Sequence, residues 1–149
     1  MSHLLAVCAL VLEDGGSEDE AIGALLHDVV EDTATSLDDV RREFGDRVAA
    51  IVAGCGEPLP KSEPWRRRKE AHLAHLAGAD ASVVRVALAD KLHNARSTRR
   101  DGPDVWARFN APKAEQAWWY GSLLELFRAR STSPMVDELA AEVGALFGA

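Results

Sequence analysis

The stretch Ala24–Thr33, "ALLHDVVEDT", decides how the chain is organised because it joins an apolar helical pattern to a crowd of charges. One histidine and three carboxylates fall within the six residues from His27 to Asp32. Neighbouring carboxylates repel one another, and acids in the last turn of a helix oppose its macrodipole. A purely structural helix gains nothing from this pattern, so it indicates a positive partner that the sequence itself does not supply.

The segment before this stretch predicts where its helix begins. Ser17 precedes the apolar pattern and Glu20 follows three positions later, the spacing of a capping box. We expect one continuous helix from this cap through Asp32. On such a helix His27 and Glu31 lie four residues apart, as do Asp28 and Asp32, so all four side chains would share one polar face.

Helical periodicity recurs along the rest of the chain, and alternating β-branched runs are nearly absent. The fold class is therefore predicted to be all-α, a single helical bundle. A segment with three prolines and two glycines, residues 54–64, is predicted to be a loop at the rim of a site. The expected helices cover about residues 2–14, 18–32, 37–44, 46–55, 65–77, 80–97, a stretch with "VWARFN" after a polar turn around residues 99–103, 114–130 and 133–148. Within the helix around residue 90, the apolar stripe consists of Val84, Leu88, Leu92 and Ala95.

Length and charge narrow the class of protein. A chain of 149 residues is one domain's worth, which we expect to comprise a core of about residues 2–130 and a C-terminal amphipathic helix of about residues 133–148. The formal net charge of -7 would repel a nucleic-acid backbone, so we expect no nucleic-acid partner. The apolar N-terminal run is too short to span a bilayer and lacks a signal-peptide pattern, so we expect no membrane partner. Cys8 and Cys55 have no ligand or partner at short spacing, which favours buried thiols in a cytoplasmic protein.

The adjacent His27 and Asp28 offer one nitrogen and one oxygen ligand, a set that Mn²⁺, Fe²⁺, Zn²⁺ or Co²⁺ accepts. Two ligands do not complete a site, so further ligands must come from other helices. Asp90 is conspicuous because it follows a mostly apolar run, where an unpaired carboxylate would be costly to bury. The histidines available as further ligands are His3, His72, His75 and His93.

The ordered motifs "ALLHDVVEDT", "REFGDRVAAIVAGC" and "VRVALADKLHNAR" resemble the HD superfamily of metal-dependent phosphohydrolases. The resemblance covers roughly residues 2–100 and is strongest to the hydrolase domain of RelA/SpoT-type proteins, which degrade the alarmone (p)ppGpp of the stringent response. It implies an HD-domain enzyme that releases the 3′-pyrophosphate of a guanosine nucleotide, with a divalent metal, typically Mn²⁺. The metal ligands that it implies are His3, His27, Asp28 and Asp90.

The same resemblance implies roles for three further residues. Glu31 and Asp32 would orient and deprotonate the attacking water, and Asn94 would lie beside the metal or the substrate ribose. The family's basic segment before its first histidine is not matched, because only Met1 and Ser2 precede His3 and Leu4 stands where a proline is usual.

Two further groups of residues have competing interpretations. The consecutive basic residues Arg66, Arg67, Arg68 and Lys69 either bind substrate phosphates or form a solvated basic face. For the histidines, His72 and His75 are assigned to packing or to the surface, and His93 is expected to orient Asp90. The aromatic residues Trp106, Phe109, Trp118, Trp119 and Tyr120 form the core or the surface of a homodimer, or, as a sharper idea, stack on a purine.

Two alternative functions stay open on the sequence alone. One is phosphohydrolysis of another nucleotide, such as a deoxynucleoside monophosphate or a nicotinamide cofactor. The other is a non-catalytic module that binds metal or nucleotide after loss of the N-terminal segment. The partner expected under each hypothesis is a small-molecule nucleotide.

Overall fold

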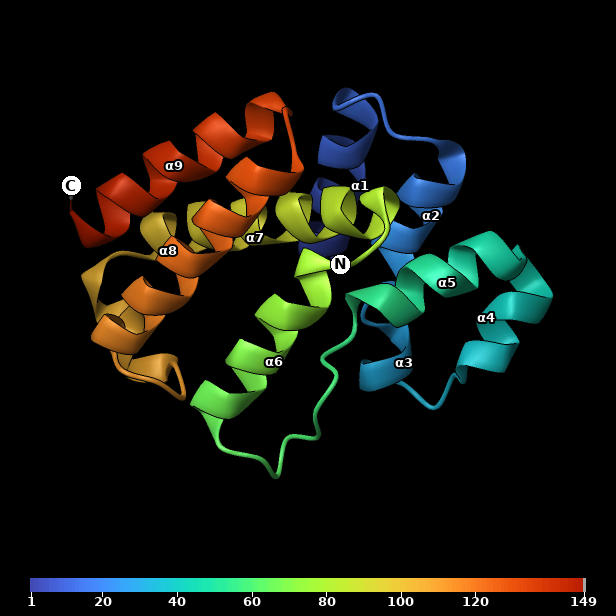
Figure 1. Cartoon of the computed structure of the whole chain (residues 1–149), viewed down its shortest axis with the longest axis horizontal. Coiled ribbons are helices and arrows are strands. Elements are labelled where there is room, and N and C mark those ends of the chain that lie inside the picture. The colour runs from blue at the N-terminus through green and yellow to red at the C-terminus, as the bar shows by residue number, and fades with distance from the viewer. Residues whose placement is uncertain (149) are drawn as a thin grey trace.

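The computed structural model describes residues 1–148, and within that range the regular secondary structure is entirely helical, with no strand (Figure 1). The prediction of an all-α bundle is confirmed. The helices are α1 (Ser2–Glu13), α2 (Glu18–Leu26), α3 (Val29–Asp32), α4 (Leu37–Phe44), α5 (Asp46–Cys55), α6 (Trp65–Ala77), α7 (Ala81–Asp101), the 3₁₀ helix η1 (Pro103–Arg108), α8 (Lys113–Arg130) and α9 (Pro134–Phe147). No helix within the described residues is both long and apolar enough to cross a bilayer.

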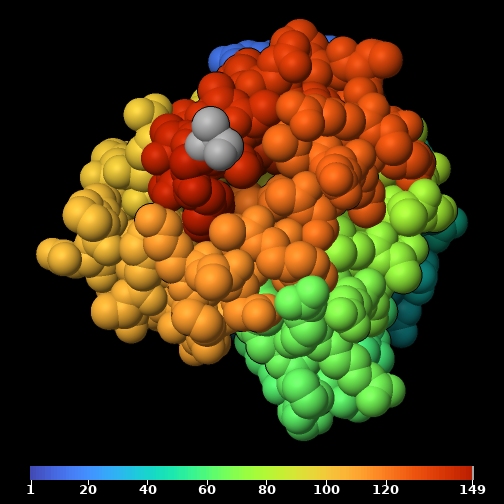
Figure 2. Space-filling view, turned by 60° about the vertical axis from the view of Figure 1, so that its left-hand side comes forward, coloured from blue at the N-terminus to red at the C-terminus, as the bar shows by residue number. Residues whose placement is uncertain are grey.

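Helix α7 is the central element; α4 packs on α5 and α6 packs on α8, while most of the other helices pack on α7 itself (Figure 1). Helices α1, α2 and α5 lie along one part of α7, while α8 and α9 cover another. The predicted stripe of Val84, Leu88, Leu92 and Ala95 is buried as expected. Figure 2 shows α8 and α9 side by side on one face, with the segment around α6 projecting beyond them. The core therefore runs the length of α7 and fixes the position of any side chain that this helix presents.

The predicted helix starts are confirmed. The Ser17 hydroxyl accepts from the Glu20 backbone N–H, and the Glu20 carboxylate accepts from the Ser17 N–H, which completes the capping box of α2. Ser36 and Asp39 form the same arrangement at α4. These local hydrogen bonds explain why the sequence alone located both helix starts.

The prediction of one continuous helix through Asp32 is wrong. Helix α2 ends at Leu26, and His27 and Asp28 form a turn before the single-turn helix α3. The His27 ring donates from Nδ1 to the Ala24 carbonyl at 2.6 Å, a side-chain hydrogen bond that competes with the backbone pattern. The turn gives His27 and Asp28 directions that a straight helix would not.

The loop predicted over residues 54–64 starts two residues later, because α5 continues through Gly54 and Cys55. Gly54 acts as a packing residue: a Cβ at this position would collide with the Val83 side chain of α7. The glycine lets α5 approach α7 closely, where the sequence suggested a helix end. The remaining loop runs from residue 56 to residue 64, as the prolines indicated.

The central helix is longer than the sequence predicted, because α7 extends to Asp101 and displaces the turn expected around residues 99–103. Ion pairs with α9 support its last turns: Arg96 binds Glu138, and Arg99 donates from Nη2 to Glu142 at 3.0 Å. The chain then reverses at Gly102, whose φ of +87° favours glycine. The "VWARFN" segment follows as the 3₁₀ helix η1 rather than as part of a longer α-helix.

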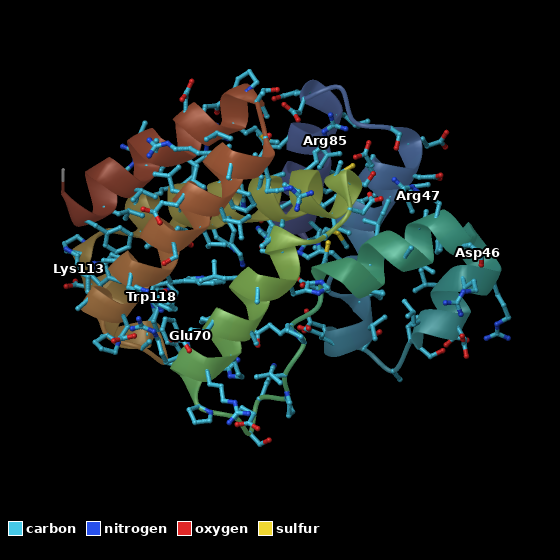
Figure 3. All side chains as sticks on the ribbon, viewed as in Figure 1. Asp46, Arg47, Glu70, Arg85, Lys113 and Trp118 are labelled. Carbon is cyan, nitrogen blue, oxygen red and sulfur yellow. The ribbon has the colours of Figure 1, made fainter. Side chains whose placement is uncertain are left out.

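Arg85 joins the central helix to the first two helices (Figure 3). Its Nε donates to Asp14 at 3.0 Å, and its Nη1 donates to Glu20 at 2.9 Å. Both carboxylates are largely buried, so each depends on this guanidinium for compensation. The network holds α1 and α2 in a fixed position against α7.

A Phe127→Ala variant tests the location of the core. Phe127 is fully buried, so its truncation should lower the free energy of unfolding by about 3–5 kcal/mol. Urea unfolding followed by circular dichroism measures this loss. The matched control is Phe44→Ala, because Phe44 is 48% exposed and its truncation should cost less than about 1 kcal/mol. Equal losses in the two variants would contradict the assigned core.

Candidate metal centre

Four side chains from three parts of the chain converge into what we call the metal cluster: His3, His27, Asp28 and Asp90. The ligand atoms of His3, His27 and Asp28 all lie within 4.8 Å of one another. Asp90 joins them, since its Oδ1 is 2.8 Å from His3 Nε2 and 3.2 Å from His27 Nε2. The structure therefore brings all four predicted metal ligands together.

The ring of His27 is oriented by the backbone. Because Nδ1 donates to the Ala24 carbonyl, Nε2 is the atom that faces the carboxylates, 3.3 Å from Asp28 and 3.2 Å from Asp90. A backbone acceptor behind a histidine ligand is the usual arrangement at metal sites, because it fixes the tautomer and the ring direction. The turn between α2 and α3 is thus the local structure that aims this ligand.

Electrostatics within the cluster favour a positive charge between its carboxylates. Burial would lower the pKa of His27, but its hydrogen bond to Asp90 and the attraction of Asp90 and Asp28 raise the pKa to about 9. Burial would likewise raise the pKa of Asp90, but the Lys91 ammonium and hydrogen bonds from His27 and His3 lower it well below its usual range. At neutral pH the His27 ring therefore carries a positive charge beside the carboxylates of Asp28 and Asp90.

The donor set fits a divalent cation. Two imidazole nitrogens and two carboxylate oxygens form the borderline set that Mn²⁺, Fe²⁺, Zn²⁺ and Co²⁺ accept. A divalent cation at His27 Nε2 would supply the positive charge that the His27 proton otherwise provides to Asp28 and Asp90.

The surroundings of Asp90 differ in one respect from the sequence prediction. His93 does not orient Asp90: its Nδ1 lies 2.7 Å from Nδ1 of His3, so His93 positions the histidine ligand instead. One helical turn from Asp90, the Asn94 amide reaches Asp90 Oδ2 at 3.4 Å, and Lys91 Nζ lies 3.2 Å from the same oxygen. Lys91 was not among the predicted site residues, although a cation directly after a buried aspartate was a usable signal.

A cavity of about 550 Å³ opens beside the cluster, and we call it the cluster cavity. His27, Asp28 and Asp90 line it, together with the predicted catalytic residue Glu31. Asp32, the second predicted catalytic residue, is exposed and does not line this cavity. The loop contributes Glu57, Leu59, Pro60 and Lys61 to the wall, so its predicted location at the rim is confirmed.

The basic residues of α6 separate into two groups. Arg66 and Arg67 do not line the cluster cavity or the second cavity, which lies between α6, α7, η1 and α8. Arg66 stacks on Trp118 and pairs with Glu70, and Arg67 is 67% exposed. Their assignment to substrate binding stays a prediction. Arg68 and Lys69 instead turn toward the cavities, and both contact Glu57. The four consecutive basic residues gave no signal that could separate the inward ones from the outward ones.

A second cavity, the aromatic cavity, has a volume of about 480 Å³ and lies between α6, α7, η1 and α8. Trp119, Tyr120 and Phe109 provide its aromatic walls, and Asn94 and Lys69 line it as well. Lys91 lines both cavities, so the two are neighbours. Trp119 and Tyr120 are buried, as one of the sequence interpretations required, while Phe109 is exposed.

The remaining histidines and the cysteines lie outside the metal cluster. His75 binds the Gly54 carbonyl at 2.8 Å, whereas His72 is buried against Trp119 and its Nδ1 has no hydrogen-bond partner among the described residues. Both therefore have packing roles, as predicted. Cys8 and Cys55 are free thiols, and burial raises the pKa of Cys55 to about 12.

The buried position of His72 leads us to expect that the free energy of unfolding depends on pH. Burial and the nearby cations Lys91 and Lys69, opposed only by Glu57, lower the pKa of His72 from 6.5 to about 4, and His75 also disfavours its charge. The unfolded chain therefore binds a proton at a higher pH than the folded chain does. The contribution of neutral His72 to the free energy of unfolding is complete above pH 6.5. It decreases as the pH falls from 6.5 through 4, by about 3 kcal/mol at most.

A His72→Leu variant isolates this contribution. We expect its free energy of unfolding, measured in urea at pH 7, 6, 5 and 4, to fall less steeply than that of the wild type. Parallel curves for the two proteins would show that His72 does not titrate as its surroundings require.

Comparison with known proteins yields matches along most of the chain. The family profile described as "HD domain" matches residues 1–114. The guanosine-3′,5′-bis(diphosphate) 3′-pyrophosphohydrolase MESH1 of Xenopus tropicalis is 35% identical over 109 residues, which are 72% of this chain and 60% of that protein. The chain thus spans about three fifths of this curated relative.

Two solved structures share the whole fold. The crystal structure of a Listeria monocytogenes protein has a TM-score of 0.89 at 29% identity and covers 99% of this chain and 94% of its own. The structure described as a metazoan ortholog of SpoT that hydrolyses ppGpp has a TM-score of 0.82 at 25% identity and covers 99% of this chain and 82% of its own.

Proposed function

Because this chain belongs to the HD-domain family, we propose that it is a metal-dependent phosphohydrolase that removes the 3′-pyrophosphate from a guanosine nucleotide such as ppGpp. The observation that carries the proposal is the convergence of His3, His27, Asp28 and Asp90 beside a cavity lined by Glu31. The proposed metal ligands and the proposed base therefore lie beside the same cavity. The choice of ppGpp as the proposed substrate comes from the similar proteins that are named for this reaction.

The cluster would hold the metal, and Mn²⁺ is the ion that we propose. Such an ion lowers the pKa of a bound water to about 7 and neutralises charge on a phosphoryl oxygen. The ring of His27 is already oriented, because its Nδ1 donates to the Ala24 carbonyl and leaves Nε2 toward the carboxylates. His3 Nε2 and Asp90 Oδ1 already lie 2.8 Å apart, and a cation would replace the hydrogen bond between them.

Glu31 is the residue that we propose as the proton acceptor. It lines the same cavity as the metal ligands, and its exposed carboxylate can pass a proton to solvent. In the proposed reaction, water adds to the phosphorus next to the 3′-oxygen, the 3′-O–P bond breaks, and pyrophosphate leaves the nucleoside. Asn94 lines the aromatic cavity and is the residue that we assign to the ribose.

The aromatic cavity is the proposed site of the nucleoside. Tryptophan and tyrosine rings offer flat faces on which a purine can stack. Because Lys91 connects the two cavities, a nucleoside in one would direct its phosphates toward the other. We further propose that the enzyme acts on a free nucleotide in the cytoplasm.

Pyrophosphate release from ppGpp tests the function directly. The metal-stripped protein is assayed with and without Mn²⁺ against ppGpp, a deoxynucleoside monophosphate and a nicotinamide cofactor. Mn²⁺-dependent release from ppGpp alone is the expected result. Turnover of another member of the panel would replace the substrate, and silence with metal bound would identify a binding module.

A further inference from the structure

Glu57 stands in the loop before α6 and is bound by two consecutive cations of that helix. Its Oε2 accepts from Arg68 Nη1 at 2.8 Å, and its Oε1 accepts from Lys69 Nζ at 2.6 Å. The side chains of Glu57, Arg68 and Lys69 are only 21%, 13% and 16% exposed. Solvent screens this triplet much less than it screens the surface ion pairs of the molecule.

The triplet lies where the two cavities meet. Glu57 and Arg68 line the cluster cavity, while Lys69 lines the aromatic cavity. Lys91, which lines both, adds a third cation at this junction. A ligand that extends from one cavity to the other would therefore meet Arg68 and Lys69.

Glu57 satisfies these cations incompletely. It gives a single oxygen to the Arg68 guanidinium, and Arg68 Nε is buried without a hydrogen-bond partner among the described residues. A phosphate group has three terminal oxygens and can accept from an arginine fork and an ammonium at the same time. The two cations are thus better matched to a phosphate than to the carboxylate that they bind.

The carboxylate is also a true anion at this position. Burial would raise the pKa of Glu57, but the hydrogen bonds and charges of Lys69 and Arg68 lower it below its ordinary value. Glu57 is therefore ionised throughout the neutral range and has the charge sign that a phosphate would bring.

We propose that Arg68 and Lys69 form a phosphate-binding pair and that Glu57 occupies it as an internal competitor, which a phosphate group of the substrate displaces. The inference rests on the proposed function in taking the substrate to be a phosphorylated nucleotide. The free energy needed to displace Glu57 weakens substrate binding, whereas the metal cluster is not affected. Glu57 therefore raises KM without changing kcat.

Binding of inorganic pyrophosphate to the full chain, measured by isothermal titration calorimetry in EDTA, tests this pair without metal and without turnover. Glu57→Gln removes the competing charge, so it should tighten pyrophosphate binding about tenfold, equivalent to about 1.4 kcal/mol. The matched control is Glu63→Gln, which removes an acid of the same loop that pairs with the exposed Arg67 at 3.8 Å. This control should bind pyrophosphate as the wild type does.

Two further variants keep the result interpretable. The double variant Glu57→Gln/Lys69→Met should lose the gain, because half of the cationic pair is removed. If circular dichroism shows Glu57→Gln to be unfolded, Glu57→Asp takes its place, since the shorter acid reaches the cations less well and should bind pyrophosphate more tightly than the wild type.

Unchanged or weaker binding by the folded Glu57 variant would overturn the inference. Tighter binding without any hydrolysis of ppGpp would leave the phosphate pair in place and reject only the proposed function. Hydrolysis of ppGpp without tighter binding would do the reverse.

Discussion

An Asp28→Ala variant is expected to retain no Mn²⁺ after purification and dialysis, and to lose ppGpp hydrolysis by more than about 100-fold. Asp28 supplies one of the cluster's two carboxylates and lies 3.3 Å from the ligand atom of His27. Mutation of residues that merely support metal ligands already costs about 10–100-fold, so removal of a ligand should cost more. Metal content by mass spectrometry and pyrophosphate release measure the two losses separately.

The control for this variant is Asp19→Ala, which removes an exposed acid in the first turn of α2 and changes the net charge equally. It should keep its metal and its activity. Full metal content in Asp28→Ala would remove Asp28 from the ligand set and would refute the metal centre as described.

A Glu31→Gln variant should keep the metal and still hydrolyse ppGpp about 10²–10⁴-fold more slowly. The amide preserves the shape of the side chain but cannot accept a proton, and a positioned base contributes about that factor. Equilibrium dialysis with Mn²⁺ and single-turnover kinetics separate binding from chemistry.

Asp32→Asn is the matched comparison, because it makes the same chemical change one residue further along α3. Asp32 is exposed and does not line the cluster cavity, so we expect this variant to lose less activity than Glu31→Gln. If Asp32→Asn is the slower variant, the base is Asp32, and α3 must rotate when substrate binds.

Local signals account for most of what the sequence predicted of the fold. Ser17 and Ser36 cap their helices through hydrogen bonds that span three residues, so a short pattern was sufficient to identify them. Gly54 was assigned to both the helix and the following loop, and its position in the helix depends on packing against Val83, 29 residues away. A contact of that range leaves no mark in the surrounding pattern.

In the candidate site, too, the residues of short motifs were predicted, whereas orientations that depend on long-range packing were not. The residues matched by the family motifs, His3, His27, Asp28 and Asp90, converge as the resemblance implied. The orientation of α6 was not predictable, because four basic residues in a row occupy every direction around a helix. Which of them faces inward depends on how α6 packs against α8, and that packing places Arg68 rather than Arg67 beside Glu57.

The hydrogen bonds of His3 to Asp90 and His93 also determine when the centre can first exist during protein synthesis. The two partners of His3 lie 87 and 90 positions later in the chain, on α7. At about 5–20 residues per second, the ribosome needs roughly 5–20 s to supply them. His3 must wait through that interval, so the cluster can form only after this part of α7 has been synthesised.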